Sequence, residues 1–188
     1  GPEGPAQNPE SAAKRARCSS RSRAAEPFMS GPAPVLDAMR LALVGVPNCG
    51  KTALFNRLTG SRQKVANYAG VTVERKEGSF VGPTRRERYR LLDLPGAYSL
   101  TPTTLDEAIT RDCLLGRLAG ESPPERVICV VDATNLRLNL RLVLELRDLG
   151  VPMIVALNMS DLAQSRGFGL DRERLERELG VPMVETVA

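Results

Sequence analysis

One motif constrains the fold of this chain more than any other feature. From Leu41 the sequence reads LALVGVPNCGKTALFNRLTG: an apolar run, a loop with two glycines, then Lys51, Thr52 and a pattern typical of a helix. The spacing G-x-x-x-x-G-K-T is that of a phosphate-binding loop, in which backbone N–H groups and the start of a helix surround a polyphosphate. A glycine turn that only caps a helix is the alternative. A strand before the loop and a helix after it favour the phosphate loop.

The motif assigns roles within this loop. Lys51 is expected to reach the β- and γ-phosphates, and the Thr52 hydroxyl is expected to bind Mg²⁺. We also expect the Lys51 side chain to face solvent and to have little role in packing. The residues expected to line the phosphates are Gly45, Val46, Pro47, Asn48, Cys49, Gly50, Lys51 and Thr52.

A second motif follows at the end of another apolar segment, LLDLPG. Asp93 is expected to hold Mg²⁺ through a water molecule, and the Gly96 amide to sense the γ-phosphate. By itself D-x-x-G is often an ordinary junction of strand and turn, but its position after the phosphate loop favours a functional role. The residues of this motif are Asp93, Leu94, Pro95 and Gly96.

A third motif, VALNMSD, distinguishes the bases. Asp161 can accept two hydrogen bonds from guanine, whereas adenine lacks that pair of donors. Asn158 is expected to brace the loop and Met159 to lie against the base. The alternative is that Asn158 and Asp161 only cap the next helix. The residues of this motif are Asn158, Met159, Ser160 and Asp161.

The segment NYAGVTVERKEG lies between the first two motifs. Thr72 is the candidate for a threonine that closes on Mg²⁺ and the γ-phosphate, and its alternative is a β-branched strand residue. Glu74 is either a general base or, as we favour, a solvated strand carboxylate. The candidate residues here are Gly70, Val71, Thr72, Val73 and Glu74. For the hydrolysis step itself the candidates are Lys51, Thr72 and Gly96.

Strand and helix patterns alternate along the rest of the chain. Strands are predicted over 40–46, 71–81, 85–94, 126–133, 151–158 and 181–188, and helices over 50–60, 103–116, 135–150 and 170–180. Thr104, with Glu107 three residues on, predicts the start of the second helix. Mixed charged and β-branched residues make 71–81 an edge or antiparallel strand. The pattern predicts an α/β fold of the P-loop GTPase (Ras-like) class, a three-layer sandwich with a mostly parallel, twisted sheet.

Composition excludes several kinds of binding site. The net charge of the 188 residues is +4, and residues 1–28 hold five basic and three acidic side chains, so the body is nearly neutral and no nucleic-acid surface is expected. Residues 1–35 are rich in Pro, Gly and Arg, which predicts a disordered basic tail. There is no histidine, and the four cysteines lack metal-ligand spacing, so iron is not expected to bind this chain.

Residues from about 38 to 188 resemble the N-terminal GTPase domain of the FeoB-type ferrous iron transporter. The segments that carry the resemblance are GVTVERKEG, DLPGAYSL, VVDATNLRLNL and ALNMSD. The resemblance implies a G domain over 38–188 at the cytoplasmic face of a bacterial inner membrane. Helical and membrane domains that this chain does not contain would follow it. It also implies that the G domain is cut within its fifth guanine-contacting motif, where Val187 and Ala188 stand, and that Asn48 binds K⁺.

The chain departs from the family pattern at several positions. The family often has Asn where Val46 stands, and Trp-Pro where Tyr68 and Ala69 stand, which puts the details of switching in doubt. Ala97 follows Gly96 where Ras-like proteins carry a glutamine that orients water. Hydrolysis is therefore expected to be slow and to depend on Mg²⁺, K⁺ and backbone groups.

The predicted function is a GTP-binding, slowly hydrolysing domain that acts as a nucleotide switch for ferrous iron uptake. The alternative is a soluble, potassium-dependent GTPase of ribosome or tRNA maturation. A regulatory binding module with incidental hydrolysis is a third hypothesis. The expected cofactors are GTP or GDP, Mg²⁺ and K⁺. The expected partners are the guanine nucleotide and the absent domains, and self-association stays open.

Overall fold

The computed structural model describes residues 38–60, 63–84 and 87–188, so the tail predicted over 1–35 lies outside the described residues. The elements alternate in the predicted manner. In chain order they are β1 (Met39–Gly45), α1 (Lys51–Thr59), β2 (Gln63–Asn67), β3 (Glu74–Val81), β4 (Arg88–Asp93), α2 (Leu105–Leu114), β5 (Arg126–Asp132), α3 (Leu136–Asp148), β6 (Met153–Asn158), α4 (Ser160–Ser165), α5 (Arg172–Leu179) and β7 (Met183–Thr186).

The strands form one seven-stranded sheet in the order β2-β3-β4-β1-β5-β6-β7. β3 is antiparallel to both β2 and β4, while all neighbours from β4 to β7 are parallel. The carboxyl ends of β4, β1, β5 and β6 therefore lie at one edge of the sheet, which is where ligands of open α/β sheets bind. All three predicted motifs begin where one of these strands ends.

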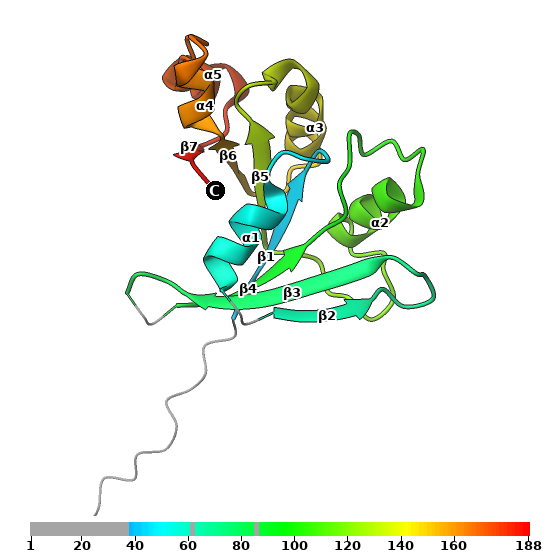
Figure 1. Ribbon diagram of the computed structural model, residues 1–188. Helices are drawn as coiled ribbons and strands as arrows, with labels where there is room; N and C mark the ends of the chain where they lie inside the picture. The colour runs from blue at the N-terminus through cyan, green and yellow to red at the C-terminus, as the bar shows by residue number, and fades with distance from the viewer. Residues whose placement is uncertain (1–37, 61–62, 85–86) are drawn as a thin grey trace, which may run out of the picture. The chain divides into compact units, whose positions relative to one another are not determined.

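Helices cover both faces of the sheet, with α1 on one side and α2 and α3 on the other (Figure 1). β1 lies at the centre, and its residues from Leu41 to Gly45 are buried, as expected of a strand covered on both faces. Gly78 of β3 explains how closely α1 approaches, because a Cβ atom there would lie 2.7 Å from the Cβ of Thr59 and 3.1 Å from the ring of Phe55. The predicted α/β sandwich is therefore confirmed.

The second and third helices begin and pack as their sequences indicate. The Thr104 side chain caps α2 by accepting a hydrogen bond from the Glu107 backbone N–H at 3.3 Å, which confirms the predicted start. α3 buries Leu142, Val143 and Leu146 on one face. This apolar face fixes α3 beside β5 and β6 and thereby sets the position of the polar residues on its flank.

Two elements were not predicted, and the strands β3, β6 and β7 are shorter than predicted. β2 is exposed along its whole length and joins the sheet through backbone pairing with β3, so no apolar pattern marks it. α4 has only six residues, too few to show a helical period. β3 begins at Glu74 rather than at 71, and because β2 covers it, it is not an edge strand.

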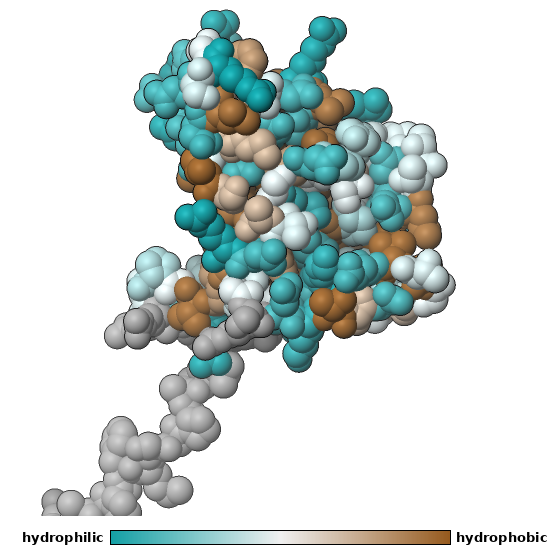
Figure 2. Space-filling view, in the orientation of Figure 1, coloured by the Kyte–Doolittle hydropathy of each residue, from teal (hydrophilic) through white to brown (hydrophobic). Residues whose placement is uncertain are grey.

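Apolar side chains at the surface are scattered among polar ones on the face shown in Figure 2. Scattered exposed apolar residues are normal for a globular domain. In residues 38–60, 63–84 and 87–188, the helices are too short or too polar to span a bilayer.

Candidate nucleotide-binding site

The loop between β1 and α1 has the backbone that a phosphate cradle requires. Gly50 has φ 85° and Asn48 has φ 65°, both in the left-handed region. A Cβ atom on Gly50 would overlap the side-chain amide of Asn158, and one on Gly45 would lie 2.7 Å from the carbonyl oxygen of Val130. Glycine is therefore needed at both ends of the loop, for conformation at Gly50 and for close approach at both.

Lys51 does not face solvent, so that prediction is wrong. Its Nζ donates to the Asp93 carboxylate and to the Leu94 carbonyl oxygen, each at 2.5 Å, and its side chain is only 12% exposed. The cause is the sheet register, because Leu43 of β1 pairs with Asp93 of β4 and the carboxylate stands beside the start of α1. The largely buried Lys51 side chain thus places its charge against the Asp93 carboxylate.

Two adjoining hollows lie above the ends of β1 and β4. The first, of about 400 Å³, is lined by Thr52, Thr72 and Asp93 together with Lys51. The second, of about 520 Å³, is lined by Pro47, Asn48, Lys51, Thr52 and Gly96 among others. Hydroxyl and carboxylate oxygens are the ligands that Mg²⁺ prefers, so Thr52, Thr72 and Asp93 fit the ion that the sequence predicts.

The D-x-x-G segment is attached to the phosphate loop by its backbone. Leu94 N donates to Leu43 O at 3.1 Å, and Ala97 N donates to Gly45 O at 3.2 Å. A Cβ atom on Gly96 would lie 3.0 Å from the ring of Pro47. Asp93 and Gly96 are thus held beside the loop, which an ordinary junction of strand and turn would not require.

Two carboxylates hold the loop that follows, over 97–103. Glu107 of α2 is buried and accepts hydrogen bonds from Tyr98 N at 3.2 Å, Thr103 N at 2.9 Å and the Thr103 hydroxyl at 2.9 Å. The hydrogen bond from the Thr103 backbone is the largest of the effects that lower the pKa of Glu107. Each of these bonds favours the charged carboxylate.

Glu145 of α3 is the second carboxylate. It accepts from the Ser99 hydroxyl at 2.9 Å, from Leu100 N and from Arg141 Nε at 2.9 Å. Burial acts to raise the pKa of Glu145, but the hydrogen bonds from Leu100, Arg141 and Ser99 outweigh it, so the pKa is lowered. The loop is therefore fixed to both helices of this face.

Asn158 joins three segments of the chain. Its side-chain amide is buried and donates to Cys49 O at 3.1 Å, and its carbonyl oxygen accepts from Ala188 N at 3.0 Å and from the Thr186 hydroxyl at 3.3 Å. The N-cap of α4 is Met159, with no side-chain cap, so Asn158 does not serve as a helix cap. It braces the phosphate loop instead.

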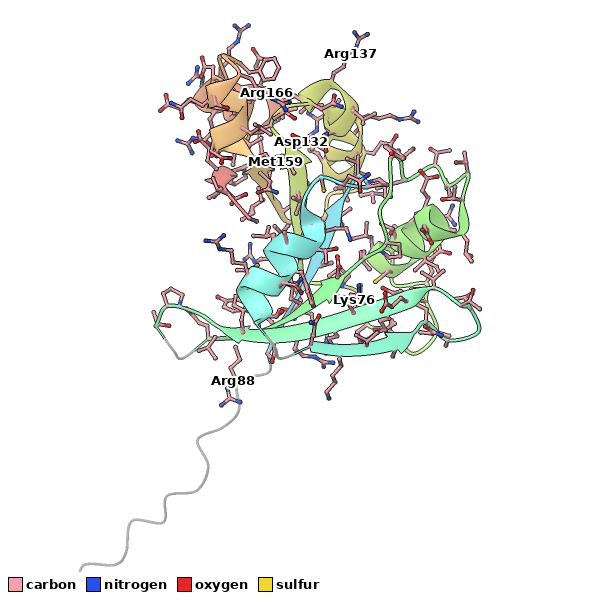
Figure 3. The ribbon with its side chains drawn as sticks, viewed as in Figure 1. Lys76, Arg88, Asp132, Arg137, Met159 and Arg166 are labelled. Carbon is pink, nitrogen blue, oxygen red and sulfur yellow. The ribbon has the colours of Figure 1, made fainter. Side chains whose placement is uncertain are left out.

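The candidate base-recognition residues surround Asn158. Asp161 is exposed in the first turn of α4, and Ser160 donates through its hydroxyl to Thr186 O at 3.3 Å. Met159 has φ 59°, a conformation rare for a residue with a long side chain. Figure 3 shows Met159 and Asp132 at the ends of β6 and β5. Val187 is exposed, and its carbonyl oxygen accepts from Arg57 at 3.3 Å.

Thr72 lies in a closed turn between β2 and β3. Tyr68 N donates to Val73 O at 3.0 Å, Val71 N donates to Tyr68 O at 3.2 Å, and Gly70 has φ 77°. Thr72 is exposed and precedes β3, so its alternative as a strand residue is wrong. Glu74 begins β3 with its side chain 53% exposed and 3.2 Å from Lys76 Nζ.

Sequence reasoning missed that Glu107 and Glu145 hold the loop over 97–103. Glu107 carried a signal, because a capping acid at the third helical position reaches back to the chain before the helix. Glu145 carried none, because Arg141 and Glu145 four residues apart are typical of a solvated helix face. The buried Tyr68 ring was likewise noticed only as a departure from the family pattern.

Comparison with known proteins identifies one family and relatives that belong to it. Residues 39–188 match the family described as Ferrous iron transport protein B. The Fe(2+) transporter FeoB of Salmonella typhimurium is 49% identical over 154 residues, which cover 80% of this chain and 19% of that protein. The chain therefore spans about a fifth of the length of this relative.

Solved structures of FeoB domains are also similar to this chain. The G domain of the T. maritima FeoB iron transporter is 42% identical, with a TM-score of 0.71, over 80% of this chain and 88% of that one. The cytosolic domain of the same transporter in its GMPPNP form is 43% identical, with a TM-score of 0.73, over 79% of this chain and 56% of that one. The predicted P-loop GTPase fold is confirmed.

Proposed function

Because the chain belongs to the Ferrous iron transport protein B family, we propose that it is a guanine-nucleotide switch domain that binds GTP and hydrolyses it slowly. One observation carries the proposal. The ion pair from Lys51 to Asp93 and the hydrogen bond from Asn158 to Cys49 bring the three predicted motifs together at one edge of the sheet. Phosphate contacts, Mg²⁺ ligands and base recognition require that proximity.

The phosphate loop would hold the nucleotide largely by its backbone. The N–H groups of residues 45–52 and the start of α1 favour negative charge. For Lys51 to contact the β- and γ-phosphates, its Nζ must exchange the Asp93 carboxylate for phosphate oxygen, which leaves Asp93 free to hold a metal-bound water. Mg²⁺, when bound, neutralises charge on the phosphates, and Thr52, Thr72 and Asp93 are its proposed ligands.

Guanine selectivity is assigned to Asp161. An exposed carboxylate at the start of α4 can accept from the two donors on the guanine edge. Asn158 positions this segment relative to the phosphate loop, and Met159 supplies an apolar surface for the base. Val187 and Ala188 stand at the start of the fifth base-contacting segment.

Because Ala97 stands where Ras-like proteins have a glutamine, other groups must orient the attacking water. Ala97 is fully buried and has no polar side chain, so water can be oriented only by groups such as the Gly96 amide and Thr72. Asn48 lines the second hollow and offers an oxygen for K⁺, which would stabilise charge at the leaving phosphate oxygen. Hydrolysis in this arrangement is slow.

The role in the whole protein follows from the family. We propose that the domain lies at the cytoplasmic face of a bacterial inner membrane. It would precede helical and membrane domains, and nucleotide binding would regulate the entry of ferrous iron. Self-association of the domain is compatible with this role. The alternative, a soluble GTPase of ribosome or tRNA maturation, is disfavoured by the family match.

Nucleotide binding tests the proposal directly. A fluorescent GDP analogue should bind the chain, and unlabelled GDP should displace it far better than ADP. Asp161→Asn should weaken binding of guanine nucleotides by about 10- to 100-fold, which corresponds to about 1.5–3 kcal/mol. Equal displacement by ADP and GDP would contradict the proposal.

The potassium role has its own test. Hydrolysis should be faster in KCl than in NaCl at equal ionic strength. Asn48→Ala should remove that difference while GDP affinity stays within about threefold, a change of less than 1 kcal/mol. Equal rates in the two salts for the wild-type chain would rule out K⁺.

A further inference from the structure

We propose that Tyr68 is the positioning residue that docks the loop over 68–73 on the body of the domain and so places Thr72 at the metal site. The inference rests on the proposed function, because only a GTPase needs Thr72 there. It concerns a position at which this chain departs from the family pattern.

The loop is a closed unit with one buried side chain. β2 ends at Asn67 and β3 begins at Glu74, and these two residues are paired. The backbone hydrogen bond from Tyr68 N to Val73 O closes the loop that joins them. Within it, Ala69, Gly70 and Thr72 are exposed, and Val71 and Val73 are half-buried. Tyr68 alone is buried, with 4% of its surface exposed. Burial of an aromatic ring is the largest apolar contribution available to a loop of this size.

The Tyr68 ring belongs to the same buried core cluster as Leu91 of β4 and Cys113 of α2. Burial raises the pKa of its hydroxyl, and Cys113 of α2, Glu121 and Asp93 act in the same direction, while Arg75 acts against it. Arg75 itself pairs with Glu121 and Glu77 at 2.5 and 2.7 Å. Through this ring the loop is joined to the core of the domain.

The geometry connects this anchor to the proposed metal site. Thr72 and Val73 line the same hollow as Lys51, Thr52 and Asp93. Thr72 lies four positions after Tyr68, and the two loop hydrogen bonds leave little freedom between them. If the ring leaves its site, Thr72 is held at the rim of the hollow only by Val71 and Val73, which pack against the core but are half-buried.

Docking of the Tyr68 ring is less favourable than the buried area of the ring alone would indicate. The Tyr68 hydroxyl is buried, and no described residue forms a hydrogen bond with it. A buried hydroxyl that lacks a partner makes the docked state less favourable than docking of the bare ring. Phenylalanine at this position should therefore dock better than tyrosine, and alanine should hardly dock at all.

The experiment is amide hydrogen exchange on the 188-residue chain without nucleotide, for wild type, Tyr68→Phe and Tyr68→Ala. The backbone N–H groups of residues 68 and 71 should exchange about tenfold faster or more in Tyr68→Ala, and about fivefold slower in Tyr68→Phe, a factor that corresponds to about 1 kcal/mol. Tyr89→Phe is the matched control, because it makes the same chemical change at a half-buried tyrosine in β4. It should leave the exchange of both amides unchanged.

Kinetics supply the second measurement. Single-turnover hydrolysis should fall about tenfold in Tyr68→Ala and should need more Mg²⁺ for half-maximal rate, whereas GDP affinity should stay within about twofold. Tyr68→Phe should restore the wild-type rate or exceed it. Circular dichroism melting identifies any unfolded variant, and Tyr68→Leu then replaces Tyr68→Ala.

Unchanged exchange of residues 68 and 71 in a folded Tyr68→Ala or Tyr68→Leu variant would overturn the proposal. So would exchange in Tyr68→Phe as fast as in the alanine variant, because the hydroxyl and not the ring would then be the anchor. Failure of the wild-type chain to bind guanine nucleotide would contradict the proposed function instead. In that case the exchange experiment still decides whether Tyr68 docks the loop.

Discussion

The two loops beside the proposed γ-phosphate position are held by opposite kinds of interaction. The loop over 68–73 meets the core through apolar side chains, of which the Tyr68 ring is the most buried, whereas the loop over 97–103 is held by two carboxylates that accept hydrogen bonds from its backbone. Apolar burial is non-directional, but charge-assisted hydrogen bonds fix both position and orientation. The first loop is thus suited to release and redocking, and the second to holding Gly96 still.

The two loops should also respond differently to pH and salt. Burial of an uncharged ring changes little with pH or salt, while carboxylates with lowered pKa values contribute stability only when they are charged. Loss of a charged group should therefore have its largest effects at the loop over 97–103 and its smallest effect at an exposed carboxylate beside the loop over 68–73.

Glu107→Ala should destabilise the domain by about 2–3 kcal/mol, because the variant removes the buried carboxylate that accepts the part-buried hydrogen bonds from the backbone N–H groups of Tyr98 and Thr103. Urea denaturation measures the free energy of unfolding. Glu178→Ala is the matched control, since that carboxylate is 60% exposed in a pair with Arg174, and it should cost less than about 0.5 kcal/mol. If the two variants lose equal stability, the loop over 97–103 is not held by Glu107.

Glu145→Gln should cost less, about 1–2 kcal/mol, because the amide keeps one acceptor oxygen for Leu100 N or for the Ser99 hydroxyl. Glu145→Ala removes both oxygens and should cost more than Glu145→Gln in the same urea experiment. Equal losses would indicate that the charge of Glu145, rather than its hydrogen bonds, is what the loop requires.

Acid should weaken the attachment of the loop over 97–103. Glu107 and Glu145 have pKa values below the ordinary 4.5 in the folded state, so each contributes stability above that pH and loses it as the pH falls through the lower, folded value. The free energy of unfolding should therefore decline below about pH 5, and less steeply in the double variant Glu107→Gln, Glu145→Gln. An identical slope in both proteins would contradict the two lowered pKa values.

Glu74→Gln should have the smallest effect. The carboxylate is 53% exposed in its pair with Lys76, so the free energy of unfolding should change by less than about 0.5 kcal/mol. GTP hydrolysis should stay within about twofold of wild type, equivalent to about 0.4 kcal/mol in the barrier. A tenfold loss of hydrolysis with unchanged GDP affinity would instead make Glu74 the general base.

Most of the fold was predictable because its signals are local. The apolar run of β1, the Thr104 cap of α2 and the leucine face of α3 each lie within one element, and each was confirmed. β2 gave no such signal, since it is exposed and owes its place to backbone pairing with β3. A strand stabilised only by its neighbour cannot be recognised from its own side chains.

The sequence by itself determined which residues can do the chemistry and the order in which they come. The motif GVPNCGKT needs only a strand before it and a helix after it, and D-x-x-G and N-x-x-D need only the ends of further strands. Because parallel strands end at one edge of a sheet, the α/β alternation already implied that these three segments would meet.

Only the tertiary structure decided how the segments hold one another. Lys51 meets Asp93 across 42 positions of sequence, Ser99 meets Glu145 across 46, and Asn158 meets Cys49 across 109. Tyr68 is likewise buried in a core cluster whose other members, such as Leu91 and Cys113, are distant in sequence. The physical reason is that burial and hydrogen-bond partners depend on strand order and on helix packing, and no window of sequence contains either.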